Sequence, residues 1–239
     1  MGPTLAAAQA EGVYVRLLDV RVEPSDAAVW EAAVEGVARA ARVSQLEACC
    51  AWLLYREGPY RYRVVLFSDG LADLDTPESF AEAFAGTPGE ALFRASVQRL
   101  QRTRYEVVED LIHQMVRGWS TVDEMSTASH PKGRLTKYWV RPGADAAFDA
   151  AMREYAALLT AVGYPYPVEG FRWRVGSPSV NYVVVFPDAW SGFLGENGIR
   201  PTLERHGRAA DYDALLMRIA ATVSRVEYHD IDYDPALSY

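Results

Sequence analysis

The segment FRWRV, residues 171–175, places two arginines, Arg172 and Arg174, one position apart. Side chains alternate between the two faces of a strand, so both arginines share one face and the apolar residues share the other. Guanidinium groups bind carboxylates and phosphates through paired hydrogen bonds. If the apolar face meets helices, both arginines face the space between two sheets and would hold an anionic ligand. Alternatively, they pair with Asp or Glu of the facing sheet, or the strand is an exposed edge.

Large aromatic side chains fall on several predicted strands, where they either line an aromatic pocket or simply fill the core. His229 belongs to the polar run HDIDYD, residues 229–234, near the end of the chain. That run is better explained by salt bridges than by a metal, which would need ligands from other elements as well, so we predict no metal site. The predicted ligand-binding residues are Arg172, Arg174, Tyr55, Trp52, Trp173, Tyr182 and His229.

An internal repeat indicates how these residues are positioned. Moving the second half back by 119 positions places Val183 on Val64 and Phe186 on Phe67, with no gap across residues 52–69. At the positions of Arg172 and Arg174 the first copy has Leu53 and Tyr55, so the two halves would present different walls to a ligand. Chemistry is therefore expected where the copies differ.

Each half is predicted to contain the same order of elements, β-α-β-β-α-β. Residues 105–115 fit a helix or a strand by pattern alone. Their counterparts in the second half are rich in β-branched and aromatic residues, so the segment is predicted to be a strand. The predicted organisation is a first ferredoxin-like repeat over residues 13–119, a linker over 120–134 and a second repeat over 135–239.

This duplicated order resembles the dimeric α/β-barrel superfamily in its tandem single-chain form, over nearly the whole chain. The resemblance implies an α+β fold with two ferredoxin-like sheets packed face to face as an intramolecular α/β-barrel. Members of the superfamily include cofactor-free monooxygenases acting on polyketide-like aromatics, haem-handling enzymes, dye peroxidases, stress-response proteins and small-molecule sensors. Because the fold does not fix the function, the site has to be argued from its residues.

Haem would need an axial ligand. His113 and His229 fall on the last predicted strand of each half, but they are not equivalent in the repeat, since 113 + 119 gives Asp232. The basic motif expected of a chlorite-dismutase-like haem site is not recognisable. The adjacent Cys49 and Cys50 have no evident histidine partner and are interpreted as small buried residues. We therefore predict no cofactor.

The composition limits the partners. The formal charge of −8 argues against nucleic-acid binding, which needs a basic surface. No apolar run reaches the length of a membrane span, so no membrane partner is predicted. The stretch LAAAQA, residues 5–10, is either the remainder of a signal peptide or a tail, which leaves cytoplasmic and exported locations open. Homo-oligomers remain possible through strand edges or outer helices.

Three functions are compatible with these features. The first is a small-molecule-binding protein whose ligand is apolar or aromatic and carries an anionic group. The second is a cofactor-free monooxygenase-like enzyme acting on an aromatic substrate. The third is a structural or interaction protein without a pocket. The sequence contains no motif that decides whether the chain is an enzyme.

Overall fold

The structure is a computed structural model that describes residues 13–46, 51–68, 80–123, 130–176 and 179–239. The stretch LAAAQA and the two cysteines lie outside the described residues, so the expectations about them stay predictions. The chain divides into two compact units, Met1–Ile112 with Tyr233–Tyr239, and His113–Asp232. Each unit is described by itself.

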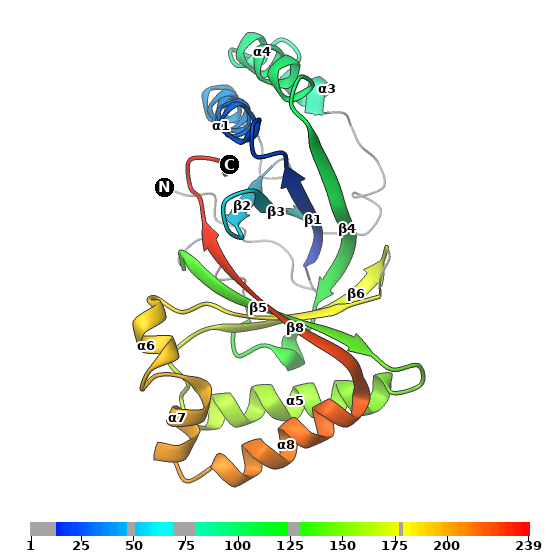
Figure 1. The fold of residues 1–239 in the computed structure, drawn as a ribbon, viewed down its shortest axis with the longest axis vertical. Coiled ribbons are helices and arrows are strands. Elements are labelled where there is room, and N and C mark those ends of the chain that lie inside the picture. Colours follow the sequence, from blue (N-terminus) through cyan, green and yellow to red (C-terminus); the bar gives the residue numbers. More distant parts are fainter. Residues whose placement is uncertain (1–12, 47–50, 69–79, 124–129, 177–178) are drawn as a thin grey trace. The chain divides into compact units, whose positions relative to one another are not determined.

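The first unit pairs β1 antiparallel to β3, and β3 antiparallel to β2. Helices α1 and α4 pack against each other (Figure 1). The apolar stripe of α1 repeats at helical spacing, and Trp30 packs from it against Tyr62, with ring centroids 4.4 Å apart. The elements of this part of the chain are β1 (Tyr14–Val22), α1 (Ala27–Ser44), β2 (Trp52–Arg56), β3 (Arg61–Ser68), α3 (Phe80–Phe84), α4 (Glu90–Leu100) and β4 (Tyr105–Met115).

In the second unit β7 pairs with β5 and β6, and β5 also pairs with β8, all antiparallel. Figure 1 shows α5 and α8 side by side along one face of this sheet. Phe148, Met152 and Leu159 of α5 are buried there against Val183 and Val185 of β7. The elements are a 3-10 turn η2 (Arg117–Trp119), β5 (Lys132–Val140), α5 (Asp145–Ala161), β6 (Val168–Val175), β7 (Asn181–Val185), α6 (Trp190–Leu194), α7 (Ile199–Arg205), α8 (Ala209–Thr222) and β8 (Val223–Tyr233).

The fold class is α+β, with the strand order β1-β3-β2 in the first unit and β8-β5-β7-β6 in the second. The predicted order β-α-β-β-α-β is present in both repeats, and residues 105–115 form a strand, as predicted from the repeat. β5 begins at Lys132, three residues before the predicted start of the second repeat. The cause is pairing with β8, because Lys132 lies opposite Asp232 in the ladder.

Candidate functional site

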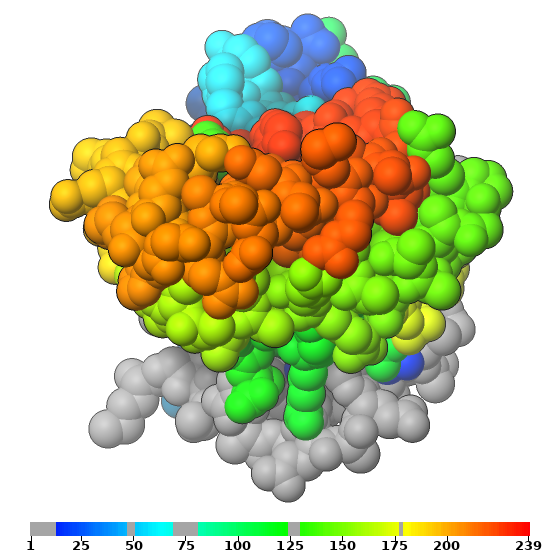
Figure 2. Space-filling view, turned by 90° about the horizontal axis from the view of Figure 1, so that it is seen from below, coloured from blue at the N-terminus to red at the C-terminus, as the bar shows by residue number. Residues whose placement is uncertain are grey.

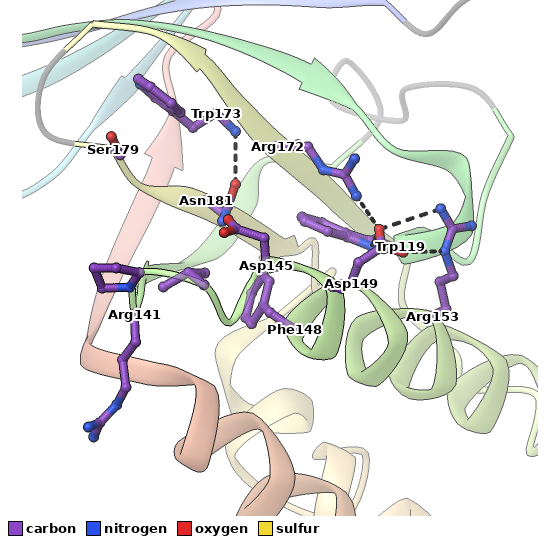
Figure 3. Close-up of a pocket in the computed structure, with 13 residues that line it drawn as sticks. Trp119, Arg141, Asp145, Phe148, Asp149, Arg153, Arg172, Trp173, Ser179 and Asn181 are labelled. Carbon is purple, nitrogen blue, oxygen red and sulfur yellow. Dashed lines mark hydrogen bonds and ion pairs between the residues drawn. The ribbon is translucent and has the colours of Figure 1, made fainter.

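A cavity of about 670 Å³ lies in the second unit, where the first turns of α5 face β6 and β7. This volume falls in the range of about 300–1,000 Å³ that is typical of small-molecule sites. Figure 3 shows its wall, which combines aromatic rings with charged groups. The lining residues are Trp119, Val140, Arg141, Pro142, Asp145, Ala146, Phe148, Asp149, Arg153, Arg172, Trp173, Ser179 and Asn181.

Asp149 is the centre of the charged part of the wall. Its carboxylate accepts hydrogen bonds from Arg153 Nε at 2.8 Å, from Trp119 Nε1 at 3.1 Å and from Arg172 Nη2 (Figure 3). Partial burial acts to raise the pKa of Asp149, but the Arg153 hydrogen bond and the Arg172 charge outweigh it and lower the pKa. The group is therefore ionised at neutral pH and is a weak base.

The helix and the strand each contribute to this cluster for a local reason. Asp149 and Arg153 are four residues apart on α5, so they share a helix face. Trp119 approaches β6 closely at Gly170, where a Cβ would lie 2.3 Å from the Trp119 Cβ. The absence of a side chain at Gly170 therefore gives the indole its place in the wall.

Arg172 lies over this indole. Its guanidinium carbon is 4.9 Å from the centroid of the Trp119 ring, a cation–π contact. A guanidinium has five N–H donors, and the bond to Asp149 uses Nη2. The charged lining residues are Arg141, Arg153 and Arg172 with Asp145 and Asp149, so a positive excess depends on Arg141. Arg141 points away from the cavity in Figure 3 and donates from Nε to the Val223 carbonyl at 2.8 Å.

Asn181 and Trp173 form the opposite, neutral part of the wall. The Asn181 Oδ1 accepts a hydrogen bond from the Trp173 backbone N–H at 2.9 Å, which holds the amide in place (Figure 3). The indole Nε1 of Trp173 donates to the Gly176 carbonyl at 3.1 Å. These bonds fix a polar amide and a large aromatic residue at the mouth of the hairpin between β6 and β7.

The condition under which both arginines would face the space between two sheets, an apolar face of β6 meeting helices, is not met for Arg172. Arg172 lies on the face of β6 that meets α5, and its partner is a helix carboxylate, Asp149, instead of a group from a facing sheet. The face that meets α5 contains Gly170 and Val168, so it has room for an arginine beside the apolar contacts. Arg174 bonds to the side chain of Gln114 and does not line the cavity.

The other predicted ligand contacts lie elsewhere. Trp52 and Tyr55 belong to the first unit, where Trp52 Nε1 donates to the Leu237 carbonyl and Tyr55 packs against Tyr233. Tyr182 is buried against His113, with ring centroids 4.4 Å apart.

His229 lies 3.4 Å from a Glu227 carboxylate oxygen, between Nε2 and Oε2. Of the seven predicted residues the cavity therefore brings together Arg172 and Trp173. Trp119, Asp149, Arg153 and Asn181 were not predicted. The i,i+4 spacing of Asp149 and Arg153 was the one signal that pointed to two of them.

The cavity does not fit haem. Haem iron takes His, Cys, Met or Tyr as its protein ligand, and none of these residue types occurs among the described residues that line the cavity. Within the described part of the chain, no group of three or more His, Cys, Asp or Glu residues is arranged to hold a metal ion. Asp230 and Asp232 of the HDIDYD run form ion pairs with Arg134 and Lys132.

Comparisons with known proteins show which solved structures share the fold of this chain. No protein-family model matches the sequence, and no curated protein matches it. Solved structures match over almost the full length. A candidate monooxygenase from Lactobacillus acidophilus has 11% identity and a TM-score of 0.55 over 93% of this chain and 94% of its own. An anthrone oxidase-like protein has 14% identity and a TM-score of 0.54, over 95% and 93%.

A variant chlorite dismutase from Candidatus Nitrospira defluvii has 11% identity and a TM-score of 0.53, over 96% of this chain and 93% of its own. The chain has the dimeric α/β-barrel fold. This confirms the predicted resemblance. At such low identity the dimeric α/β-barrel fold carries no assignment of substrate or residue role. Among the described helices, none has the length and apolar character to cross a membrane.

Proposed function

We propose that the chain binds a small aromatic molecule carrying one anionic group, in the cavity between α5 and β6. The observation that carries this proposal is the arrangement of Arg172, which stacks on Trp119 and shares a single carboxylate, Asp149, with Arg153. Two guanidinium groups around one carboxylate give this cluster a local positive charge beside an indole, although Asp145 also lines the cavity. A ligand carboxylate would use that charge, and its ring would lie along the aromatic wall.

The size and lining of the cavity support a ligand of this class. About 670 Å³ is ample for a fused two-ring molecule, and the lining includes the aromatic residues Trp119, Phe148 and Trp173. The amide of Asn181 adds a hydrogen-bonding group that can fix the orientation of the ligand. A structural or interaction protein without a pocket, the third function predicted from the sequence, would not need this combination of cavity volume and charge.

Isothermal titration calorimetry with three matched probes tests the proposal. We expect 2-naphthoate to bind with a dissociation constant on the order of 10–100 µM, and 2-naphthamide and cyclohexanecarboxylate to bind at least about tenfold more weakly. The amide lacks the charge, and the cyclohexane ring lacks the flat aromatic face.

Two variants on the same strand locate the binding site. Arg172→Gln should weaken 2-naphthoate binding about tenfold, which corresponds to about 1.4 kcal/mol. Arg174→Gln is the matched control, because Arg174 bonds to Gln114 outside the cavity, and its affinity should equal that of the wild type. Failure of all three probes to bind, or equal effects of the two variants, would remove the proposed site.

A second candidate is cofactor-free oxidation of an aromatic substrate in the same cavity. It is favoured by the similarity to a candidate monooxygenase and to an anthrone oxidase-like protein. The lowered pKa of Asp149 weakens this candidate, because such a reaction needs a base that removes a proton from the substrate. Oxygen uptake with anthrone, lost in Arg172→Gln and retained in Arg174→Gln, would favour oxidation over binding alone.

A further inference from the structure

Helix α8 lies on the surface of the second unit (Figure 2) and has large exposed apolar side chains. Met217 is 76% exposed and Leu216 is 39% exposed. The opposite side of the same helix is buried in the core through Leu215 and Ile219. Burying Met217 would remove one of the most exposed large apolar groups among the described residues from water.

The exposed residues follow the helical repeat of about 100° per residue. Ala210, Ala214, Met217 and Ala221 are all exposed and form one line along the helix, directly opposite the buried line. Asp211 and Arg218 are seven residues apart, so they lie on the same flank of that line, two turns from each other. The face is thus acidic near the start of α8 and basic near its end.

This arrangement is complementary to itself. We propose that the exposed face of α8 is the interface with a second copy of this chain, packed antiparallel about a two-fold axis near Ala214 and Leu215. In an antiparallel pair, residues of the same flank meet. With the two-fold axis between residues 214 and 215, two residues lie at the same level along the helix axes when their numbers sum to 429. Asp211 therefore lies beside the partner's Arg218, and Arg218 lies beside the partner's Asp211.

The same register places the large apolar side chains of each helix between the small side chains of the other. The Met217 side chain of one copy enters the space between Ala210 and Ala214 of the other, where short side chains leave room for it. An isologous contact of this kind needs one surface patch that fits itself, and α8 satisfies this in both charge and shape.

The ion pairs that Asp211 and Arg218 form within a single copy of the chain do not oppose the interface. Asp211 pairs with Arg208, and Arg218 pairs with Glu154 on α5, and all four side chains are more than 40% exposed. Exposed pairs of this type contribute only about 0–1 kcal/mol, so their rearrangement costs little. A helix of 14 residues is about 21 Å long, which gives a small interface and a dissociation constant on the order of 10 µM.

Sedimentation velocity of the full chain over a concentration series measures this equilibrium. Asp211→Arg creates four facing positive charges in a homodimer, and Arg218→Asp creates four negative ones, so each variant should raise the dissociation constant at least about tenfold. An equimolar mixture of the two variants restores both opposite-charge pairs, and its dissociation constant should return to within about threefold of the wild type.

Met217→Glu should also leave the chain monomeric, while Arg94→Asp, an exposed charge reversal on α4, should leave the dimer unchanged. Circular dichroism confirms that each variant is folded. A wild-type chain that stays monomeric at concentrations on the order of 500 µM would overturn the interface. A dimer that resists both single variants, or a mixture that fails to recover, would overturn it equally.

Discussion

The Arg172 guanidinium lies 4.9 Å from the centroid of the Trp119 ring and bonds to the Asp149 carboxylate at its edge. One arginine therefore joins the aromatic and the charged parts of the cavity wall. A ligand with an anionic group would compete with Asp149 for this guanidinium, since a carboxylate of the protein already occupies part of its donor set. The balance between the two carboxylates should set the affinity.

Replacing Asp149 by Asn should strengthen the binding of an aromatic anion. The change removes the competing charge and leaves the guanidinium groups of Arg153 and Arg172 to the ligand. We expect the dissociation constant for 2-naphthoate to fall about threefold to tenfold, measured by calorimetry. The affinity for the uncharged 2-naphthamide should not change. Weaker binding of 2-naphthoate by the variant would show that Asp149 supports the ligand instead of competing with it.

Replacing Gly170 by Ala should displace Trp119. The new Cβ would lie 2.3 Å from the Trp119 Cβ and 3.0 Å from its carbonyl oxygen, so the indole or the strand has to move. Overpacking of this kind costs about 1–3 kcal/mol of unfolding free energy, measured by urea denaturation.

A double-mutant cycle with Trp119→Gly separates the contributions, because glycine removes the Cβ contact while the backbone carbonyl contact persists in both backgrounds. The cost of Gly170→Ala should fall by about half or more in the Trp119→Gly background, because the closest contact, with the Trp119 Cβ, is then absent. Equal costs in the two backgrounds would assign the strain to the backbone contact alone.

The fold was predictable because several independent patterns agree. The repeat at 119 positions related residues 105–115 to the last strand, and this settled a segment whose periodicity was ambiguous. The hairpin of residues 52–69 was visible as alternating apolar strands around a Gly-Pro turn, and β2 and β3 pair there. The periodicity of apolar residues and the internal repeat both follow the order of helices and strands, so they predict that order well.

The site was only partly predictable, since alternation shows which residues share a face but not what that face meets. Arg172 and Trp173 were expected as ligand contacts, yet the partner of Arg172 is Asp149, a helix residue 23 positions earlier. The close approach of Trp119 to Gly170 joins segments that are 51 residues apart, from 170 − 119. Such long-range contacts leave no periodic trace in the sequence.

The loss of unfolding free energy at acidic pH should depend on Glu31 of α1. Partial burial acts to raise its pKa, but hydrogen bonds from Arg56 and Tyr62 outweigh it and lower the pKa below the usual 4.5. A lowered folded-state pKa contributes stability above the unfolded value and loses it as the pH falls through the folded value. Glu31→Gln should therefore flatten the loss of unfolding free energy below about pH 4.5. The control is Glu35→Gln, one turn later on the exposed side of the same helix, which should retain the wild-type slope.

Two Asp–Arg pairs of the first unit should differ sharply in their effect on stability. Asp19 is fully buried and accepts hydrogen bonds from Arg61, with Arg63 Nη2 3.5 Å away. Asp110 bonds to Arg16 through two nitrogens, but both side chains are more than a third exposed.

Asp19→Asn removes the fully buried carboxylate that bonds to Arg61, while Glu57 still pairs with Arg61 and Arg63, and it should cost about 2–3 kcal/mol of unfolding free energy. Asp110→Asn should cost about 0–1 kcal/mol. Denaturation in guanidinium chloride measures both, and similar costs would contradict the role of burial.

The C-terminal residues 234–239 form a turn that acts as a clamp on β2 of the first unit. The backbones of Trp52 and Tyr239 exchange two hydrogen bonds of 2.9 Å, and Arg42 Nη2 donates to the Ser238 carbonyl at 2.6 Å. Leu237 is 3% exposed in the core beside Trp30, and its carbonyl accepts the Trp52 indole N–H.

Leu237→Ala should therefore cost about 2–4 kcal/mol of unfolding free energy, and deletion of residues 237–239 should cost more, because Trp52 also loses its two backbone hydrogen bonds to Tyr239. Urea denaturation followed by tryptophan fluorescence measures both changes. Ala236→Ser, at an exposed position of the same segment, is the matched control and should change the free energy by less than about 0.5 kcal/mol. A deletion as stable as the wild type would show that the first unit does not depend on this clamp.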